Sequence, residues 1–372
     1  MSSRWMIVAA LAACGPAIPP LPSKGGPPWR EYTTEHFTLW TDTSQKRASK
    51  LMRDMEDLRH VVIGIGFHGG GNGRVVVVAL RDEAEAKAFM PGEFKAMASQ
   101  ANSYIQQPLI MMPADTYDEV VAHELTHTIS QTVIRDQPRW FAEGLAKYFE
   151  TIKIDRGRGT VDLGREPMYR GEPLVISRLL ALRELVKCTD LTCADRHFYA
   201  SAWALFTYLM NVKPAEVTSY LQLVESANLD ELEAELKRWL VNGSHMVLHY
   251  NVKLPTFAVT ERELTDADVH AIRGLLRAEF QERKDLAKLE ADEALALDPT
   301  HVLATFLRYR VDKSTLTPDV ARAVAKAHPD DWRAQMLLAW AVREGDEATN
   351  AFTRGCELAA QNPALVTPCP TK

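Results

Sequence analysis

Two hydrophobic patterns alternate along the first 260 residues of the chain. Short apolar runs rich in β-branched and aromatic residues predict strands at 35–42, 74–80 and 103–113. Apolar residues at three- and four-residue steps predict an amphipathic helix over 44–62. The same spacing predicts helices at 82–90, 117–133, 138–150, 175–186, 198–210, 214–227 and 229–241, with a hairpin or loop at 157–164. Helices and strands mixed in this way indicate an α+β fold.

From about Glu261 the chain is expected to be helical, with prolines between the helical segments. Ala-rich helical segments are followed by prolines, which are Pro299, Pro329 and Pro363. Their spacing of 30 and 34 residues is close to the period of tetratricopeptide-type (TPR) helical hairpins. A plain helical bundle would fit the same pattern. Residues 261–372 are therefore predicted to form an all-α, TPR-like module.

Composition excludes one large class of function. The 372 residues carry a formal net charge of −6 with both signs mixed, and no long run of Lys or Arg is present. A nucleic-acid-binding protein would be basic, with clustered cations, so no nucleic-acid partner is expected. With 46% apolar residues, the chain is long enough to bury a large core in two or three domains.

The N-terminus has the features of a targeting segment. An apolar run from Trp5 to Ala13 is too short to span a bilayer. It ends in Leu-Ala-Ala-Cys, which resembles the lipobox of bacterial lipoproteins; an ordinary secretion signal is the alternative. The resemblance implies a signal peptide over 1–14 with Cys14 as the lipidated residue, on the outer membrane facing the periplasm. Residues 15–30 are rich in Pro and Gly and are expected to form an extended tether.

The remaining cysteines form two close pairs in the sequence. Cys188 is near Cys193, and Cys356 is near Cys369. An even number of cysteines in an exported protein predicts disulfides. Free buried thiols are the alternative, and a second zinc site is disfavoured because no CxxC spacing is present.

The helix predicted at 117–133 carries a candidate metal site. His123 and His127 are four residues apart and therefore lie on one helical face, one turn apart. Two neutral imidazoles placed in this way can bind one zinc ion. Glu124 follows the first histidine, so its carboxylate is rotated to the side of the metal and can serve as a base. Val121, Leu125 and their apolar neighbours would anchor this helix in the core.

A catalytic zinc ion usually takes three protein ligands and keeps one position for water. The helix predicted from Pro138 supplies Glu143, and a tight turn brings the two helices side by side. Gly144 is expected to let these helices approach closely. Glu150 is the alternative ligand, although a carboxylate at a helix end is more often exposed.

These motifs resemble the gluzincin zinc metallopeptidases, and the peptidase MA-like group in particular. The match consists of the HExxH helix, the following Pro-Arg-Trp-Phe-Ala-Glu-Gly-Leu-Ala-x-Tyr helix, and an upstream Glu-His-Phe at 35–37. The resemblance covers about residues 30–215 and is most specific over 119–150. It implies a zincin-like peptidase domain over 31–260. It also implies one zinc ion, with Glu124 as catalytic base and with ligands His123, His127 and Glu143.

The sequence departs from thermolysin-like enzymes in two respects. The gap between His127 and Glu143 is shorter, and Lys147 stands where an acidic residue would follow the glutamate ligand. Gluzincins often use a Tyr or His to stabilise the oxyanion, and Tyr199 is the candidate here, with His197 as the second choice. The strand at 103–113 is expected to be an edge strand that pairs with an extended peptide substrate.

The combined reading is a zinc-dependent metallopeptidase tethered to the cell envelope. It would hydrolyse a peptide or protein substrate through a metal-activated water with Glu124 as general base. An inactive zinc-binding scaffold lipoprotein, which binds protein partners through its helical C-terminal module, is the main alternative. A zinc hydrolase that acts on a non-peptide amide is a third reading, because a metal site does not encode its substrate.

Overall fold

The computed structural model describes most of the chain. The residues described are 18–67, 73–90, 96–99, 107–116, 118–134, 136–166, 168–169, 172–173, 179–193, 195–213, 217–242, 247–361 and 369. The expected signal peptide, with Cys14, lies outside these residues. Within them, no helix is both long enough and apolar enough to cross a membrane.

The fold is a mixed α+β arrangement organised by a sheet of six strands in the described residues, in the order β11–β1–β2–β3–β5–β4. Strands β2, β3 and β5 are parallel, whereas β1, β11 and β4 are antiparallel to their neighbours. The strands are β1 (Arg30–Thr33), β2 (Phe37–Thr41), β3 (Val75–Leu80), β4 (Met97–Ser99), β5 (Leu109–Pro113) and β11 (Thr260–Glu263).

Helices cover both faces of this sheet, and the alternation of side chains along β3 shows why. Val75 and Val77 face one core, with α1 (Gln45–Val62) and α3 (Asp118–Val133). Val76 and Val78 face the other, with α2 (Glu83–Phe89) and α9 (Asp266–Ala278). A central strand buried on both faces reads as a continuous apolar run, as the Val-Val-Val-Val sequence of β3 does.

Two sequence predictions about this sheet are wrong. The strand that precedes α3 is not an edge strand, because β5 lies between β3 and the short antiparallel β4, which the sequence pattern did not predict. Residues 103–106 of the predicted strand lie outside the described part of the chain. The chain is also not helical from Glu261: Thr260–Glu263 forms β11, which pairs with β1, and the first helix begins at Asp266.

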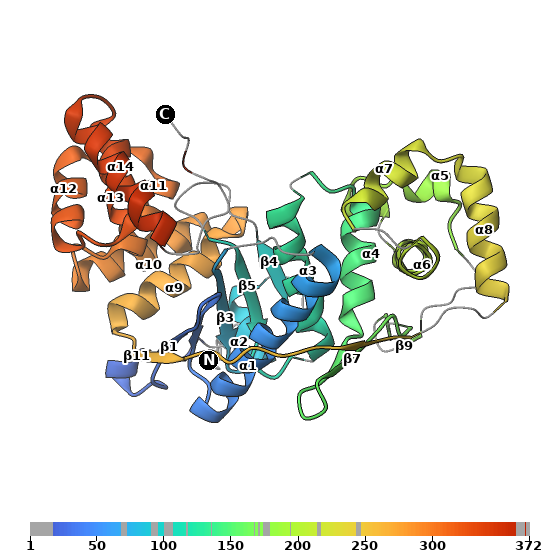
Figure 1. Ribbon diagram of the computed structural model, residues 1–372. Helices are drawn as coiled ribbons and strands as arrows, with labels where there is room; N and C mark the ends of the chain where they lie inside the picture. Colours follow the sequence, from blue (N-terminus) through green and yellow to red (C-terminus); the bar gives the residue numbers. More distant parts are fainter. Residues whose placement is uncertain are drawn as a thin grey trace, which may run out of the picture.

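The middle of the chain forms a group of helices and a small sheet, of which α4 packs against α3. Helix α4 (Arg139–Glu150) contacts α3 on one side and α6 (Arg196–Val212) on the other (Figure 1). The helix predicted at 175–186 is shorter than expected, since only Leu182–Leu185 (α5) is helical in its described part. The other elements are α7 (Ser219–Ser226), α8 (Leu229–Val241), β6 (Lys153–Asp155), β7 (Thr160–Leu163), β10 (Leu248–Asn251), β8 (Met168–Tyr169) and β9 (Glu172–Pro173).

Gly144 packs differently from the sequence prediction. A Cβ atom at this position would lie 2.7 Å from the carbonyl oxygen of Ala202 in α6. The glycine therefore permits the close approach of α4 to α6, rather than that of α4 to α3. Phe141 and Leu145, on the same helix, are completely buried.

The C-terminal part is helical, and most of its consecutive helices pack on one another, although α11 contacts α13 more than it contacts α12. The contacts join α9 with α10, α10 with α11, α12 with α13, and α13 with α14. Cys356 and Cys369 form a disulfide, and Cys188 pairs with Cys193, so both pairs predicted by proximity are confirmed. The helices are α10 (Lys284–Leu297), α11 (Val302–Val311), α12 (Pro318–Ala327), α13 (Trp332–Val342) and α14 (Asp346–Gln361).

Candidate metal centre

The candidate site lies between α3 and α4, and the sequence of α4 explains its position. This helix is apolar and buried on most of its surface, with a single polar stripe at steps of four, four and three residues. Residues at these spacings share one helical face, and this face lies against the histidine-bearing face of α3. The stripe consists of Arg139, Glu143, Lys147 and Glu150.

Three side chains converge on one point. Nε2 of His123 lies 3.2 Å from Nε2 of His127, and Oε2 of Glu143 lies 3.5 Å from each of these nitrogens. A tetrahedral ion with bonds of about 2.1 Å separates its ligand atoms by about 3.4 Å. The described residues contain no other group of three His, Cys, Asp or Glu side chains with suitable geometry. The three sides of this triangle therefore fit one tetrahedral metal ion, with the fourth position open.

Glu143 is held in place by Arg139, one turn earlier on the same helix. Nη2 of Arg139 donates to Oε1 of Glu143 at 3.2 Å. The other oxygen, Oε2, is buried and accepts no hydrogen bond from the described residues. Its nearest polar neighbours are the two histidine nitrogens at 3.5 Å, and a metal ion between these three atoms would be bound by all of them.

Glu150 supports the site from behind. Its Oε2 lies 3.0 Å from Nδ1 of His123 and accepts a hydrogen bond from Lys147 Nζ at 2.6 Å. The prediction of an exposed helix-end carboxylate is wrong, since Glu150 is only 8% exposed. It is not a direct ligand either, because it binds the far nitrogen of the imidazole. A carboxylate in this position fixes the ring orientation and the tautomer of a metal-binding histidine.

The charges of these groups are strongly coupled. Burial disfavours the charged form of His123, but Glu143 and Glu150 outweigh this effect and raise its pKa to about 9. Burial also raises the pKa of Glu143, yet the two imidazoles outweigh it and hold this pKa well below its usual range. The raised pKa of His123 favours its protonated form when no metal ion is bound. Binding of a metal ion to His123 would release this proton.

The remaining predicted residues lie around this centre. Glu124 is half-buried on α3, and its charge contributes to the raised pKa of His123. Tyr199 is in the first turn of α6, where Lys147 Nζ lies 5.7 Å from its ring centroid. The tyrosine thus neighbours the polar stripe of α4, and its role as oxyanion donor stays a prediction.

The Glu-His-Phe sequence at 35–37 has a structural role. Nδ1 of His36 lies 2.8 Å from Oε2 of Glu56, and the backbone N–H of His36 donates to the other oxygen at 3.2 Å. These bonds join the start of β2 to α1. The motif therefore stabilises the domain that carries the site.

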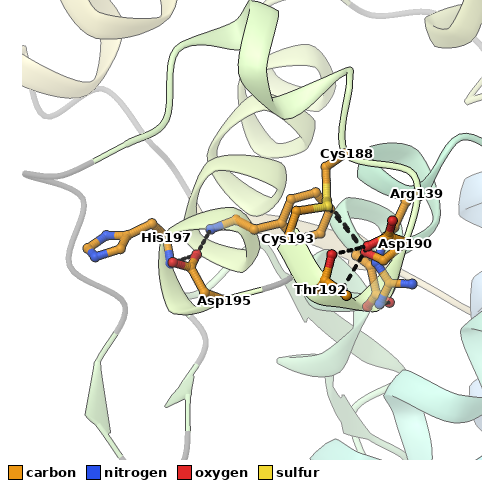
Figure 2. Close-up of a disulfide and its surroundings, with 9 residues drawn as sticks. Arg139, Cys188, Asp190, Thr192, Cys193, Asp195 and His197 are labelled. Carbon is orange, nitrogen blue, oxygen red and sulfur yellow. Dashed lines mark hydrogen bonds and ion pairs between the residues drawn. A yellow bond between two sulfur atoms is a disulfide. The ribbon is translucent and has the colours of Figure 1, made fainter.

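The disulfide loop 188–193 lies beside Arg139 (Figure 2). Hydrogen bonds from Thr192 lower the pKa of Asp190, and the charge of Arg139 adds to this effect. His197, the second choice as oxyanion donor, is in the first turn of α6, which Asp195 caps by accepting a hydrogen bond from the backbone N–H of His197 at 2.9 Å. Its ring points away from the disulfide in Figure 2.

Sequence reasoning assigned no role to Arg139 and left Glu150 as an alternative ligand. Both lie on the helical face of Glu143, four residues before it and seven after it. That spacing could have identified them, because charged residues on an otherwise apolar, buried helix need partners.

We expect Glu150→Gln to weaken zinc affinity by about 10- to 100-fold. The amide keeps the size of the side chain but removes the negative charge that faces His123. The measurement is competition with a chromogenic chelator. Glu119→Gln is the matched control, since Glu119 is on α3 and pairs with Lys153 at the surface. Equal zinc affinity in Glu150→Gln and the wild type would mean that Glu150 pairs with Lys147 but does not support His123 as a metal ligand.

Comparison with known proteins identifies one related family. Residues 119–230 match a family described as a protein of unknown function (DUF1570). The match spans α3, α4 and α6 and so includes every candidate ligand. Neither the curated proteins nor the solved structures contain a significant match to this chain.

Proposed function

We propose that this protein is a zinc-dependent peptidase with a zincin-like domain. The observation that carries the proposal is the triangle of His123, His127 and Glu143, whose ligand atoms are 3.2–3.5 Å apart. Glu124 adjoins it on the same helical turn. Two imidazoles and one carboxylate, with a fourth position open, are the donor set of a catalytic rather than a structural zinc site.

The residues around the triangle have separate roles in this proposal. Zinc held there would lower the pKa of a water molecule and polarise a peptide carbonyl group. Glu124 accepts a proton from the attacking water as the new C–O bond forms. It returns the proton to the amine as the C–N bond breaks. Arg139 and Glu150 keep Glu143 and His123 in position.

The position of β4 supports a route for the substrate. In the described residues, β4 is the outermost strand of the sheet on the side of β5, and it contacts α3. An extended peptide could add to this edge through backbone hydrogen bonds. We therefore assign to β4 (Met97–Ser99), rather than to the strand before α3, the pairing with an extended peptide substrate.

The proposal places the enzyme on the bacterial cell envelope. A lipid on Cys14 would anchor it to the outer membrane, facing the periplasm. Two intrachain disulfides suit an oxidising compartment. The packing of α9 on α10, α10 on α11, α12 on α13 and α13 on α14 supports a TPR-like module, whose stacked helices would bind a protein partner.

Metal removal and replacement test the function. We expect protein stripped with a chelator to be inactive towards an unfolded protein substrate. One equivalent of zinc per chain should restore cleavage. Zinc binding without cleavage across a broad peptide library would favour the inactive scaffold, and failure to bind zinc would show that the ligand assignment is wrong.

A further inference from the structure

A separate cavity lies on the other face of the sheet from α3. Its volume is about 570 Å³, and it is lined by residues of the sheet, α9, α11, the connection from α12 to α13, and the start of α13. Sites for small organic ligands have volumes of about 300–1,000 Å³ and mostly apolar walls. The apolar wall includes Trp40, Leu109, Ile272, Leu275, Val302 and Phe306.

The carboxylates that line this cavity already have partners. Each of these carboxylates is therefore engaged by a group other than the Arg333 guanidinium. The partners, taken from the described residues, are Arg262 for Glu31, His301 for Asp268, Arg310 for Glu279, and backbone N–H groups for Asp298 and Asp331.

Arg333 is the exception among the charged residues of the wall. No carboxylate of the described residues lies within 4.0 Å of its guanidinium. Its side chain donates to the neutral amide oxygen of Gln107 and lies 5.0 Å from the ring centroid of Trp332. Burial lowers the pKa of Arg333. The charges of Asp331 and Glu31 act in the opposite direction but do not cancel this effect.

Two further groups near Arg333 would favour an anion. Nε2 of His328, also in the wall, is buried without a hydrogen-bond partner in the described residues. Burial lowers the pKa of Arg74, and the charge of Arg333 lowers it further. Arg74 does not line the cavity, so the wall offers an anion the guanidinium of Arg333, which has no ion-pair partner in the described residues, and Nε2 of His328.

We propose that this cavity binds a small organic anion, with its carboxylate on Arg333 and its apolar body against Phe306 and Leu109. The planar guanidinium matches a carboxylate in a bidentate geometry. The volume suits a short acyl chain or the last residues of a hydrophobic peptide, which offer the same chemistry. This site is independent of the metal centre and of the proposed peptidase activity.

Calorimetry on the full chain tests this site with matched pairs of probes. Octanoate is compared with octanol, and the tripeptide Ala-Leu-Phe is compared with its C-terminal amide. We expect at least one acid to bind at least ten times more tightly than its neutral counterpart. Octanoate binding alone indicates a free organic acid, and tripeptide binding alone indicates a peptide C-terminus. Equal binding of acid and neutral probe, or no binding of any probe, overturns the proposal.

Substitution of the arginine locates the site. We expect Arg333→Gln to weaken acid binding by about 10- to 100-fold, and Arg333→Lys, which keeps the charge, to have a smaller effect. Arg354→Gln is the control, because Arg354, on α14, pairs with Asp330 and does not line the cavity. Unchanged acid binding in a folded Arg333→Gln variant would overturn the assignment. If that variant does not fold, Arg333→Lys and the probe pairs on the unaltered chain decide the question.

Discussion

Glu124→Gln is expected to slow peptide hydrolysis by about 10²- to 10⁴-fold while leaving the zinc content at one ion per chain. The amide has the size of the carboxylate but cannot accept a proton from water. None of the three candidate ligand atoms belongs to Glu124, so metal binding should persist. The measurement is the initial rate of cleavage of a fluorogenic peptide, together with metal analysis of the same sample.

Glu119→Gln on the same helix provides the control for this experiment. It makes the same chemical change at a surface carboxylate, which lies 2.9 Å from Lys153 Nζ. Its rate should stay within about twofold of the wild type, as surface ion pairs contribute little. A Glu124→Gln protein that cleaves at the wild-type rate would show that another group acts as the base.

Gly144→Ala is expected to lower the free energy of unfolding by about 2–3 kcal/mol. The added methyl group would lie 2.7 Å from the carbonyl oxygen of Ala202 and 3.2 Å from Cβ of Phe206. Backbone atoms cannot turn aside as a flexible side chain can, so α4 and α6 must separate. Because Glu143 precedes this glycine, zinc affinity should fall as well. Urea unfolding and zinc titration of the same variant measure the two effects.

Gly64→Ala is the matched control, because no atom lies within 4 Å of a Cβ atom at that position. Its free energy of unfolding should change by less than about 1 kcal/mol. If Gly144→Ala were as stable as Gly64→Ala, the close packing of α4 on α6 would not be needed for folding.

The convergence of the three candidate metal ligands could be predicted from the sequence because it depends on local geometry. Four-residue spacing places His123 and His127 on one helical face, and a short turn brings Glu143 to them. The structure brings these three residues together, as predicted. Glu150 was misjudged because helix ends are usually solvated, whereas the last turn of α4 lies against α3 and its carboxylate is engaged by His123 and Lys147.

The sheet was harder to predict because its pairings join distant segments. The three residues of β4 are too few for a periodic pattern, and its neighbour β5 could therefore be mistaken for an edge strand. The sequence of β11, Thr-Glu-Arg-Glu, is polar and exposed, so it carries no hydrophobic signal. This segment is a strand because it forms backbone hydrogen bonds with β1. The local composition of a segment does not reveal which distant strand will pair with it.

The pairing of β1 with β11 has a consequence for the order in which the chain can fold. Arg30 and Glu261, which bond across these strands, are 231 residues apart. A growing chain emerges with its N-terminus first, so β1 must wait until more than 200 further residues have been made before its outer partner exists. Until then an edge of the sheet is open to pairing with other chains, and the apolar face that α9 covers is bare. A fragment ending near residue 260 would remain in that aggregation-prone state permanently, although it contains every residue of the metal centre.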